Sequence, residues 1–111
     1  MSSPEAPGTI LARLRVAEDH PALPGHFPGR PIVPGVLLLD AVLQALREAR
    51  AGRPVRLVRA KFAAPVVPGA EVEIELSPRA AGRFAFTCRT GGVVALLGEV
   101  ACETQPPNPP Q

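Results

Sequence analysis

The feature that most limits the fold of this chain is a long apolar segment that follows a proline-rich stretch. Residues 36–51 contain no proline or glycine, and Gly52 closes the segment with Pro54 two positions further on. This pattern predicts a helix over residues 35–51 with a conventional stop. Because apolar residues occupy nearly all of its sides, we expect other parts of the protein to surround it. The polar exceptions share one stripe and are Asp40, Gln44, Arg47 and Glu48.

The remaining segments show the alternation of half-buried β-strands. Gly91 and Gly92 predict a two-residue hairpin turn, since glycine tolerates the positive φ of such turns. Strands joined by short turns favour an antiparallel sheet, so we expect an α+β fold with a sheet curled around one helix. In the second strand, Arg56, Val58, Ala60 and Phe62 are expected on one side. The predicted strands are residues 10–16, 55–62, 71–76, 83–89 and 93–102.

Size and composition exclude several classes of protein. A chain of 111 residues has room for one domain, and a net charge of +2 is not that of a strongly basic nucleic-acid binder. No apolar run approaches the ~18 residues of a membrane-spanning helix, and no signal peptide is apparent, which predicts a cytoplasmic protein. We expect loose tails at 1–7 and 104–111 around a domain at 8–103. Two cysteines, Cys88 and Cys102, are expected as free, small core residues, and their spacing predicts no metal site.

One stretch combines three groups that acid–base chemistry uses. Residues 25–40 read Gly-His-Phe-Pro-Gly-Arg-Pro-Ile-Val-Pro-Gly-Val-Leu-Leu-Leu-Asp and lead from a proline-rich loop into the predicted helix. His26 carries an imidazole, the natural general base near neutral pH. The backbone N–H of Gly35 at the helix start can hold a developing oxyanion. Asp40 interrupts an aliphatic surface and can act as an acid.

Each of these residues also has a purely structural interpretation. His26 can be an exposed loop residue, and Gly35 can serve only for close packing. Asp40, with Gln44 and Glu48, can form the solvated face of an amphipathic helix. The residues by themselves indicate a candidate acid–base site and leave these alternatives open.

The run from Gly25 to Asp40, followed by Gln44, resembles the signature of the bacterial 3-hydroxyacyl-acyl carrier protein dehydratases, the FabA/FabZ family. A second segment at 61–69, Lys-Phe-Ala-Ala-Pro-Val-Val-Pro-Gly, is similar to the strand and turn that follow the helix in that family. The resemblance spans residues 8–103. It implies a hot-dog fold, in which an antiparallel sheet wraps around one long central helix.

The resemblance also implies a reaction and a role for each residue. His26 matches the histidine that removes a proton from C2 of a 3-hydroxyacyl thioester, and Asp40 matches the acid that handles the departing hydroxyl. The N–H of Gly35 matches the donor to the thioester oxygen, and Gln44 matches a glutamine near the acid. In that family the histidine and the acid of one site come from different subunits. The residues expected to bind substrate are Phe27, Pro34, Val36 and Gln44.

The implied partner is an acyl carrier protein, and no metal or organic cofactor is needed. All but one of the 12 basic residues are arginines, which suits an acidic carrier. Arg30, Arg47, Arg50 and Arg53 are the candidates for that contact. We expect a homodimer, or a heterodimer with a paralogue.

Some features depart from the family pattern. The acid is an aspartate, as in the FabA branch, and Ala70 stands where an acidic residue is common. The small size is more similar to compact dehydratases of aryl polyene or polyketide-like pathways. Two alternatives remain open. One is a hot-dog thioesterase, which directs water at the carbonyl, and the other is a non-catalytic subunit that binds acyl carrier protein beside an active paralogue.

Overall fold

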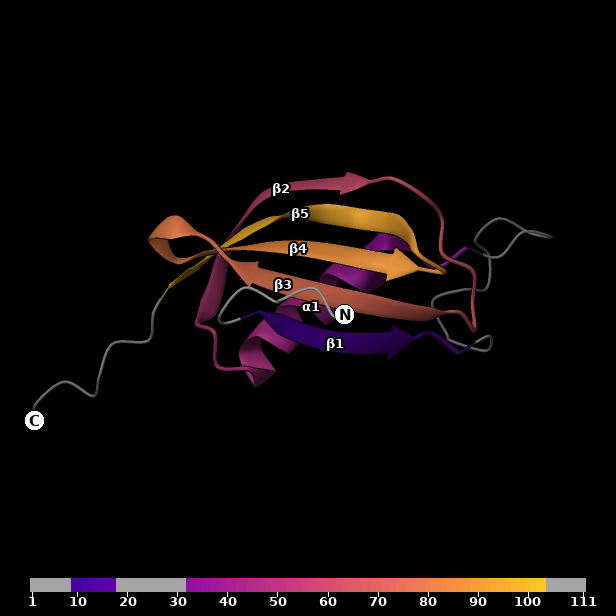
Figure 1. Ribbon diagram of the computed structural model, residues 1–111, viewed down its shortest axis with the longest axis horizontal. Helices are drawn as coiled ribbons and strands as arrows, with labels where there is room; N and C mark the ends of the chain where they lie inside the picture. The colour runs from indigo at the N-terminus through magenta and orange to yellow at the C-terminus, as the bar shows by residue number, and fades with distance from the viewer. Residues whose placement is uncertain (1–8, 18–31, 104–111) are drawn as a thin grey trace, which may run out of the picture.

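A computed structural model describes residues 9–17 and 32–103, which form an antiparallel five-stranded sheet and one long helix (Figure 1). This arrangement confirms the predicted α+β class and the hot-dog architecture. No helix within those two ranges is long and apolar enough to cross a membrane. The predicted tails, together with His26, Phe27 and Arg30, lie outside the described residues. The elements are β1 (Ile10–Arg15), α1 (Gly35–Glu48), β2 (Arg53–Phe62), β3 (Glu71–Pro78), the short 3-10 helix η1 (Ala80–Gly82), β4 (Arg83–Thr90) and β5 (Val93–Glu103).

The strand order is β1-β3-β4-β5-β2, so the chain passes from one edge of the sheet to the other by way of α1. Strands β3, β4 and β5 follow one another as hairpins, and Thr90 pairs with Val93 across the last turn. Gly91 and Gly92 have φ of +57° and +79°, which confirms the predicted two-residue turn. The two edges are β1 and β2, and β2 contacts only β5 within the sheet.

The core lies between α1 and one face of the sheet. The predicted alternation of β3 is confirmed, since Val72, Ile74 and Leu76 are buried while Glu71 and Glu73 are exposed. In β4, Phe86 and Cys88 are buried as predicted, and both cysteines are free. The helix contributes one face to this core through Leu38, Val42, Ala45 and Leu46.

The expectation that other parts of the protein surround the helix is wrong for the single chain. The sheet covers only one side of α1, and Val36 on the other side keeps 67% of its surface exposed. Asp40, Gln44, Arg47 and Glu48 are exposed on the same stripe as Val36, because residues four apart share a helix face. A monomer therefore leaves part of an apolar helix uncovered.

The helix also ends earlier than predicted, at Glu48. Arg50 and not Gly52 is the left-handed residue that terminates it, with φ of +56°. The Ala51 N–H donates to the Leu46 carbonyl and the Arg50 N–H donates to the Arg47 carbonyl, which is the Schellman pattern. Gly52 lies two residues beyond this stop, where φ is +121°.

The predicted faces of β2 need correction as well. The strand begins at Arg53 and pairs with β5 through two register shifts, between Pro54 and Arg56 and between Leu57 and Arg59. Because each bulge inserts an extra residue, simple alternation fails. Arg56 is exposed rather than sharing a half-buried face with Val58 and Ala60.

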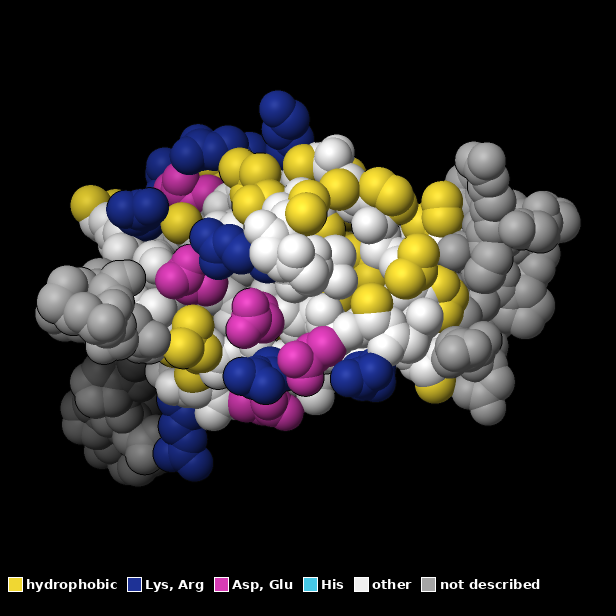
Figure 2. Space-filling view, turned by 45° about the vertical axis from the view of Figure 1, so that its right-hand side comes forward, with side chains coloured by type: hydrophobic (Ala, Val, Ile, Leu, Met, Phe, Trp, Pro, Cys, Tyr) yellow, Lys and Arg dark blue, Asp and Glu magenta, His cyan; other side chains and the backbone are white. Residues whose placement is uncertain are grey.

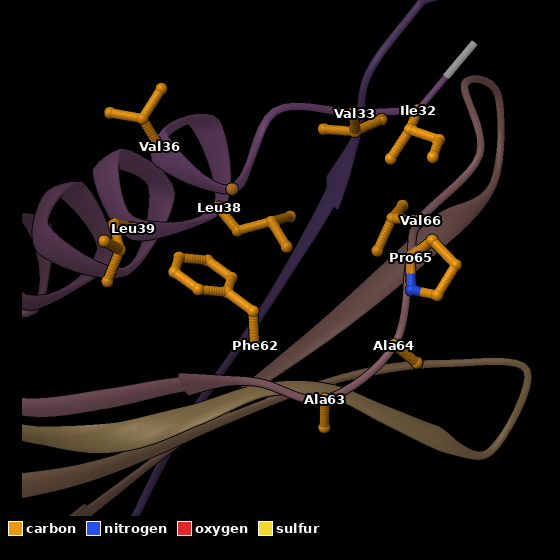
Figure 3. Close-up of a pocket in the computed structure, with 11 residues that line it drawn as sticks. Ile32, Val33, Val36, Leu38, Leu39, Phe62, Ala63, Ala64, Pro65 and Val66 are labelled. Carbon is orange, nitrogen blue, oxygen red and sulfur yellow. The ribbon is translucent and has the colours of Figure 1, made fainter. Parts of the chain in front are cut away.

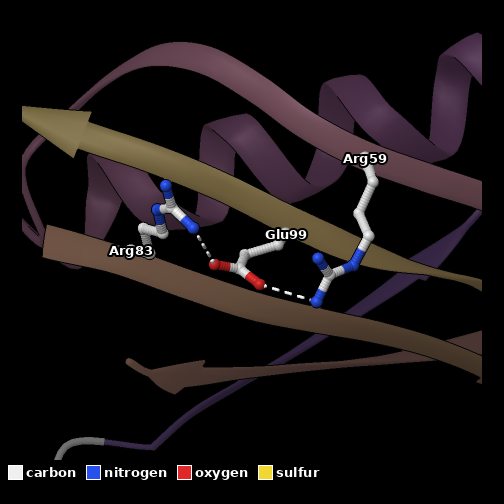
Figure 4. A network of polar contacts seen from close by, with 3 residues as sticks. All are labelled: Arg59, Arg83 and Glu99. Atoms are coloured by element: carbon white, nitrogen blue, oxygen red, sulfur yellow. Dashed lines mark hydrogen bonds and ion pairs between the residues drawn. The ribbon is translucent and has the colours of Figure 1, made fainter. Parts of the chain in front are cut away.

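Charged pairs cover the opposite face of the sheet. The Glu99 side chain is only 10% exposed and lies between Arg59 and Arg83, with N···O distances of 2.8 and 3.4 Å (Figure 4). Arg89 and Glu75 pair at 3.2 Å across neighbouring strands. Among the described residues no buried side-chain nitrogen or oxygen lacks a partner. Polar contacts thus line this face around Glu99 and Glu75, whereas α1 packs on the opposite, apolar face.

Candidate active site

An apolar pocket opens where α1 begins and β2 ends (Figure 3). Its volume is about 630 Å³, within the range of small-molecule sites. Figure 2 shows hydrophobic side chains gathered toward this end of the molecule. The described lining has no charged side chain and consists of Ile32, Val33, Gly35, Val36, Leu38, Leu39, Phe62, Ala63, Ala64, Pro65 and Val66.

Backbone hydrogen bonds hold the two walls of the pocket together. The Val33 N–H donates to the Val66 carbonyl at 2.8 Å, which ties the approach to the helix to the segment after β2. The N–H groups of Ala63 and Ala64 donate to the Ala95 carbonyl at 2.8 and 3.3 Å, which anchors that segment to β5. Main-chain hydrogen bonds therefore hold the walls of the pocket in place, and apolar side chains form its surface.

The first backbone N–H groups of α1 are not capped by any side chain of the described residues. Pro34 is the N-cap residue and makes no side-chain cap, and the first turn contains no acidic residue. The first N–H groups of a helix lack intrahelical partners and lie at the positive end of its dipole. The backbone at Gly35, which also lines the pocket, is thus suited to a partly negative oxygen.

Gly35 has a packing role at the same time. A Cβ atom built on it would lie 2.7 Å from Cζ and 2.8 Å from Cδ1 of Phe62. The structure therefore supports the close-packing interpretation of this glycine, and that interpretation is compatible with a free N–H group.

Asp40 and Gln44 do not line the pocket of the described chain. Both are exposed on the stripe of α1 that begins at Val36, a residue which does line it. The Gln44 Nε2 donates to Glu48 Oε2 at 3.1 Å, and the expected place of Gln44 near the acid of a site stays a prediction. Of the predicted site residues, the pocket brings together Gly35 and Val36, with half-buried Pro34 directly before them.

Sequence reasoning missed much of the lining. Phe62 was predicted only to share one side of its strand with Arg56, Val58 and Ala60, and Ile32 and Val33 were predicted only as part of a loop. The similarity of the segment at 61–69 to the family pattern could have pointed to this wall of the pocket. That similarity was noted, but no residue of the segment was assigned to the site. His26 and Phe27 lie outside the described residues.

The arrangement suits a long apolar group that ends in a polar one. An aliphatic chain gains from burial in such a lining, and a carbonyl oxygen at its end can accept from the helix start. Within residues 9–17 and 32–103, no three His, Cys, Asp or Glu side chains cluster as metal ligands.

Comparisons with known proteins find similarity to a family of dehydratases. The family described as ApeI-like, ApeI dehydratase, matches residues 2–98. The chain is 35% identical to the 3-hydroxyacyl-[acyl-carrier-protein] dehydratase FabZ of Haemophilus influenzae over 108 residues, covering 86% of this chain and 70% of that protein. It is 36% identical to FabZ of Magnetococcus marinus over 107 residues, with 86% and 69% covered.

Solved structures show the same fold. The dehydratase heterocomplex ApeI:P from Xenorhabdus doucetiae gives a TM-score of 0.74 at 22% identity, with 89% of this chain and 93% of that chain covered. The (R)-hydratase from A. caviae gives 0.71 at 23% identity, with 90% and 96% covered. A 1,4-dihydroxy-2-naphthoyl-CoA thioesterase from Synechocystis gives 0.52 at 17% identity, with 89% and 85% covered, so the fold alone does not specify a reaction.

Proposed function

The chain belongs to the ApeI-like dehydratase family, and on this premise we propose that it removes water from a 3-hydroxyacyl thioester on acyl carrier protein to form the trans-2-enoyl thioester. The observation that carries the proposal is the match over residues 2–98, because that range includes His26, Asp40 and every residue of the described pocket lining. The pathway is proposed to be fatty acid or polyene/polyketide-type synthesis.

The proposed reaction divides three tasks among three groups. His26 takes the proton from C2, and the electron pair left behind forms the C2–C3 double bond. The Gly35 N–H stabilises the negative charge that develops on the thioester oxygen. The C3–O bond breaks, and the hydroxyl leaves as water with a proton from Asp40. The uncapped helix start beside the apolar lining supports the role of Gly35.

We assign substrate contacts to the residues around that oxygen. Pro34 and Val36 flank Gly35, and Val36 is a member of the pocket lining. Phe27 and Gln44 complete the proposed set, Phe27 beside the base and Gln44 one turn beyond Asp40. The proposed substrate binds with its acyl chain among the aliphatic residues of the pocket.

A second copy of the chain is proposed to complete each site. Asp40 lies on the uncovered stripe of α1 and not in the pocket lining of its own chain. The open edge strand β2 carries exposed apolar side chains at Val55 and Leu57, which is unfavourable for an isolated monomer. A dimer that covers these surfaces would place Asp40 near a site that contains the partner's histidine.

The proposed carrier contact uses cations that have no ionic partner among the described residues. Arg47 and Arg50 are exposed at the end of α1 and no described carboxylate lies within 4 Å of them, whereas Arg53 already pairs with Glu103 at 3.4 Å. An acidic carrier would therefore gain more from Arg47 and Arg50 than from Arg53.

The deciding experiment is a mass-spectrometric assay of the purified protein with a short 3-hydroxyacyl-acyl carrier protein. The expected result is loss of one water from the substrate by the wild type and no loss with His26→Ala. Release of the free acid would instead identify a thioesterase. Turnover that appears only after a paralogous subunit is added, and that survives His26→Ala, would identify a non-catalytic subunit.

A further inference from the structure

Phe62 is the only aromatic residue in the described pocket lining. It is the last residue of β2, and Figure 3 shows its ring directed toward the first turns of α1, close to Leu38 and Leu39. The side chain is 55% exposed, so its ring forms part of the pocket surface and is not a core residue.

Leu38 and Leu39 lie on one side of this ring, and its other neighbours in the lining are small. Ala63 and Ala64 follow it in the chain, and Gly35 lies directly against the edge of the ring. If the ring were removed, these residues have no side chain long enough to refill its space. Phe62 therefore controls how much room the pocket offers next to the start of α1.

We propose that Phe62 is a specificity-determining residue, which limits the bulk of the acyl group near the thioester. This inference rests on the proposed function, because it takes the Gly35 N–H as the position of the thioester oxygen. An acyl chain whose carbonyl lies there passes Phe62, since the edge of its ring lies against Gly35 in the same pocket. Straight chains fit beside the ring, and chains branched close to the carbonyl collide with it.

The contact couples positions 35 and 62 directly. The ring edge occupies the place that a Cβ on residue 35 would take, with Cζ only 2.7 Å from it. Substitutions at two residues in contact are not additive, so the effect of Gly35→Ala depends on whether the ring is present.

Thermal unfolding of four proteins tests this coupling without any assay of activity. They are the wild type, Gly35→Ala, Phe62→Ala and the double variant. We expect Gly35→Ala to lower the midpoint when Phe62 is present, and to leave it unchanged or raise it when residue 62 is alanine. An equal effect of Gly35→Ala in both backgrounds would overturn the proposed steric contact.

Competition between branched and straight 3-hydroxyacyl thioesters tests the specificity. We expect Phe62→Ala to change the ratio of their kcat/KM values by about tenfold or more in favour of the branched chain, as one carbon does in other pockets. Val67→Ala is the matched control, because Val67 is an exposed apolar residue of the same connection outside the pocket lining, and the ratio should stay constant.

An unchanged ratio in Phe62→Ala, with both thioesters still converted, would overturn the specificity role. Absence of dehydration by the wild type with every thioester would overturn the proposed function, and the specificity role with it. The unfolding measurements distinguish these failures, because they report the contact between Gly35 and Phe62 in either case.

Discussion

Arg50 illustrates how a single residue can carry a conformation that its side chain does not favour. It takes the left-handed position at which glycine usually ends a helix, while the neighbouring glycine, Gly52, is used elsewhere. A residue with a Cβ in this region costs about 1 kcal/mol or more relative to glycine. The end of α1 is therefore formed at some expense in stability.

We expect Arg50→Gly to raise the free energy of unfolding by about 1 kcal/mol, since glycine relieves the left-handed strain. The measurement is urea-induced unfolding. Ala49→Gly is the control, because Ala49 has helical angles of −81° and −3°, and there glycine should lower stability by about 1 kcal/mol. Equal effects of the two substitutions would contradict the assigned helix end.

Cys88 predicts a dependence of stability on alkaline pH. Burial raises the pKa of its thiol from the ordinary value of 9.0 to about 11. The unfolded chain therefore loses this proton at lower pH than the folded chain does. The contribution of the thiol to stability is present below pH 9 and is lost as the pH rises toward about 11.

Unfolding at pH 8 and pH 10.5 should thus show a smaller loss of stability in Cys88→Ala than in the wild type. Burial also raises the pKa of Cys102, but that residue is only partly covered. Cys102→Ala should accordingly reproduce most of the wild-type pH dependence. If both variants lost stability as steeply as the wild type, the burial of the Cys88 thiol would not be the cause.

At the scale of the elements, β5 has almost no room for a side chain at Gly98. A Cβ on Gly98 would collide with the Arg59 carbonyl oxygen and would lie 2.5 Å from Cζ of Phe86 and 2.9 Å from Cα of Ala60. The β2 backbone lies against this position on one side, where Ala60 pairs with Gly98, and Phe86 of β4 pairs with Gly98 on the other side. Glycine in the middle of β5 is therefore required by its neighbours.

We expect Gly98→Ala to lower the free energy of unfolding by about 3 kcal/mol, the upper range for an overpacked core, since two of the three collisions involve backbone. Gly91→Ala is the matched control, because nothing lies within 4 Å of its Cβ position and only its φ of +57° is strained. That control should cost about 1 kcal/mol. Thermal or urea unfolding of both variants measures the difference, and equal costs would refute the close approach of β2.

At the scale of the whole molecule, the stripe of α1 that begins at Val36 and the open β2 edge leave apolar surface of a single chain uncovered. Val36 is 67% exposed and Val55 is 50% exposed, although both are apolar. Exposed apolar groups beside an unpaired strand edge favour association. This surface supports our proposal that the site is shared between subunits.

Mixing of two inactive variants tests the shared site. His26→Ala and Asp40→Ala should each be inactive, and an equal mixture should regain about a quarter of wild-type activity, because random exchange makes half of the dimers mixed and each mixed two-fold dimer holds one intact site. Size-exclusion chromatography of tagged subunits confirms exchange. No recovery among exchanging, folded variants would contradict a site built from two subunits.

Local patterns in the sequence determined most of the fold. Alternation located the strands and their buried residues, such as Ile74 and Phe86, and two adjacent glycines located the hairpin turn. These features depend on neighbours within a few positions, which a sequence displays directly. The run ending at Asp40 and the segment at 61–69 marked the family by the same kind of local pattern.

Only the tertiary structure decided the features that depend on distant neighbours. The bulges of β2 and the contact between Phe62 and Gly35 arise because β2, β5 and α1 meet in space, which no local pattern records. The exposure of Asp40 likewise follows from the sheet covering only one face of α1. Side-chain chemistry and periodicity are local properties, whereas pocket shape and burial are sums over contacts between separate elements.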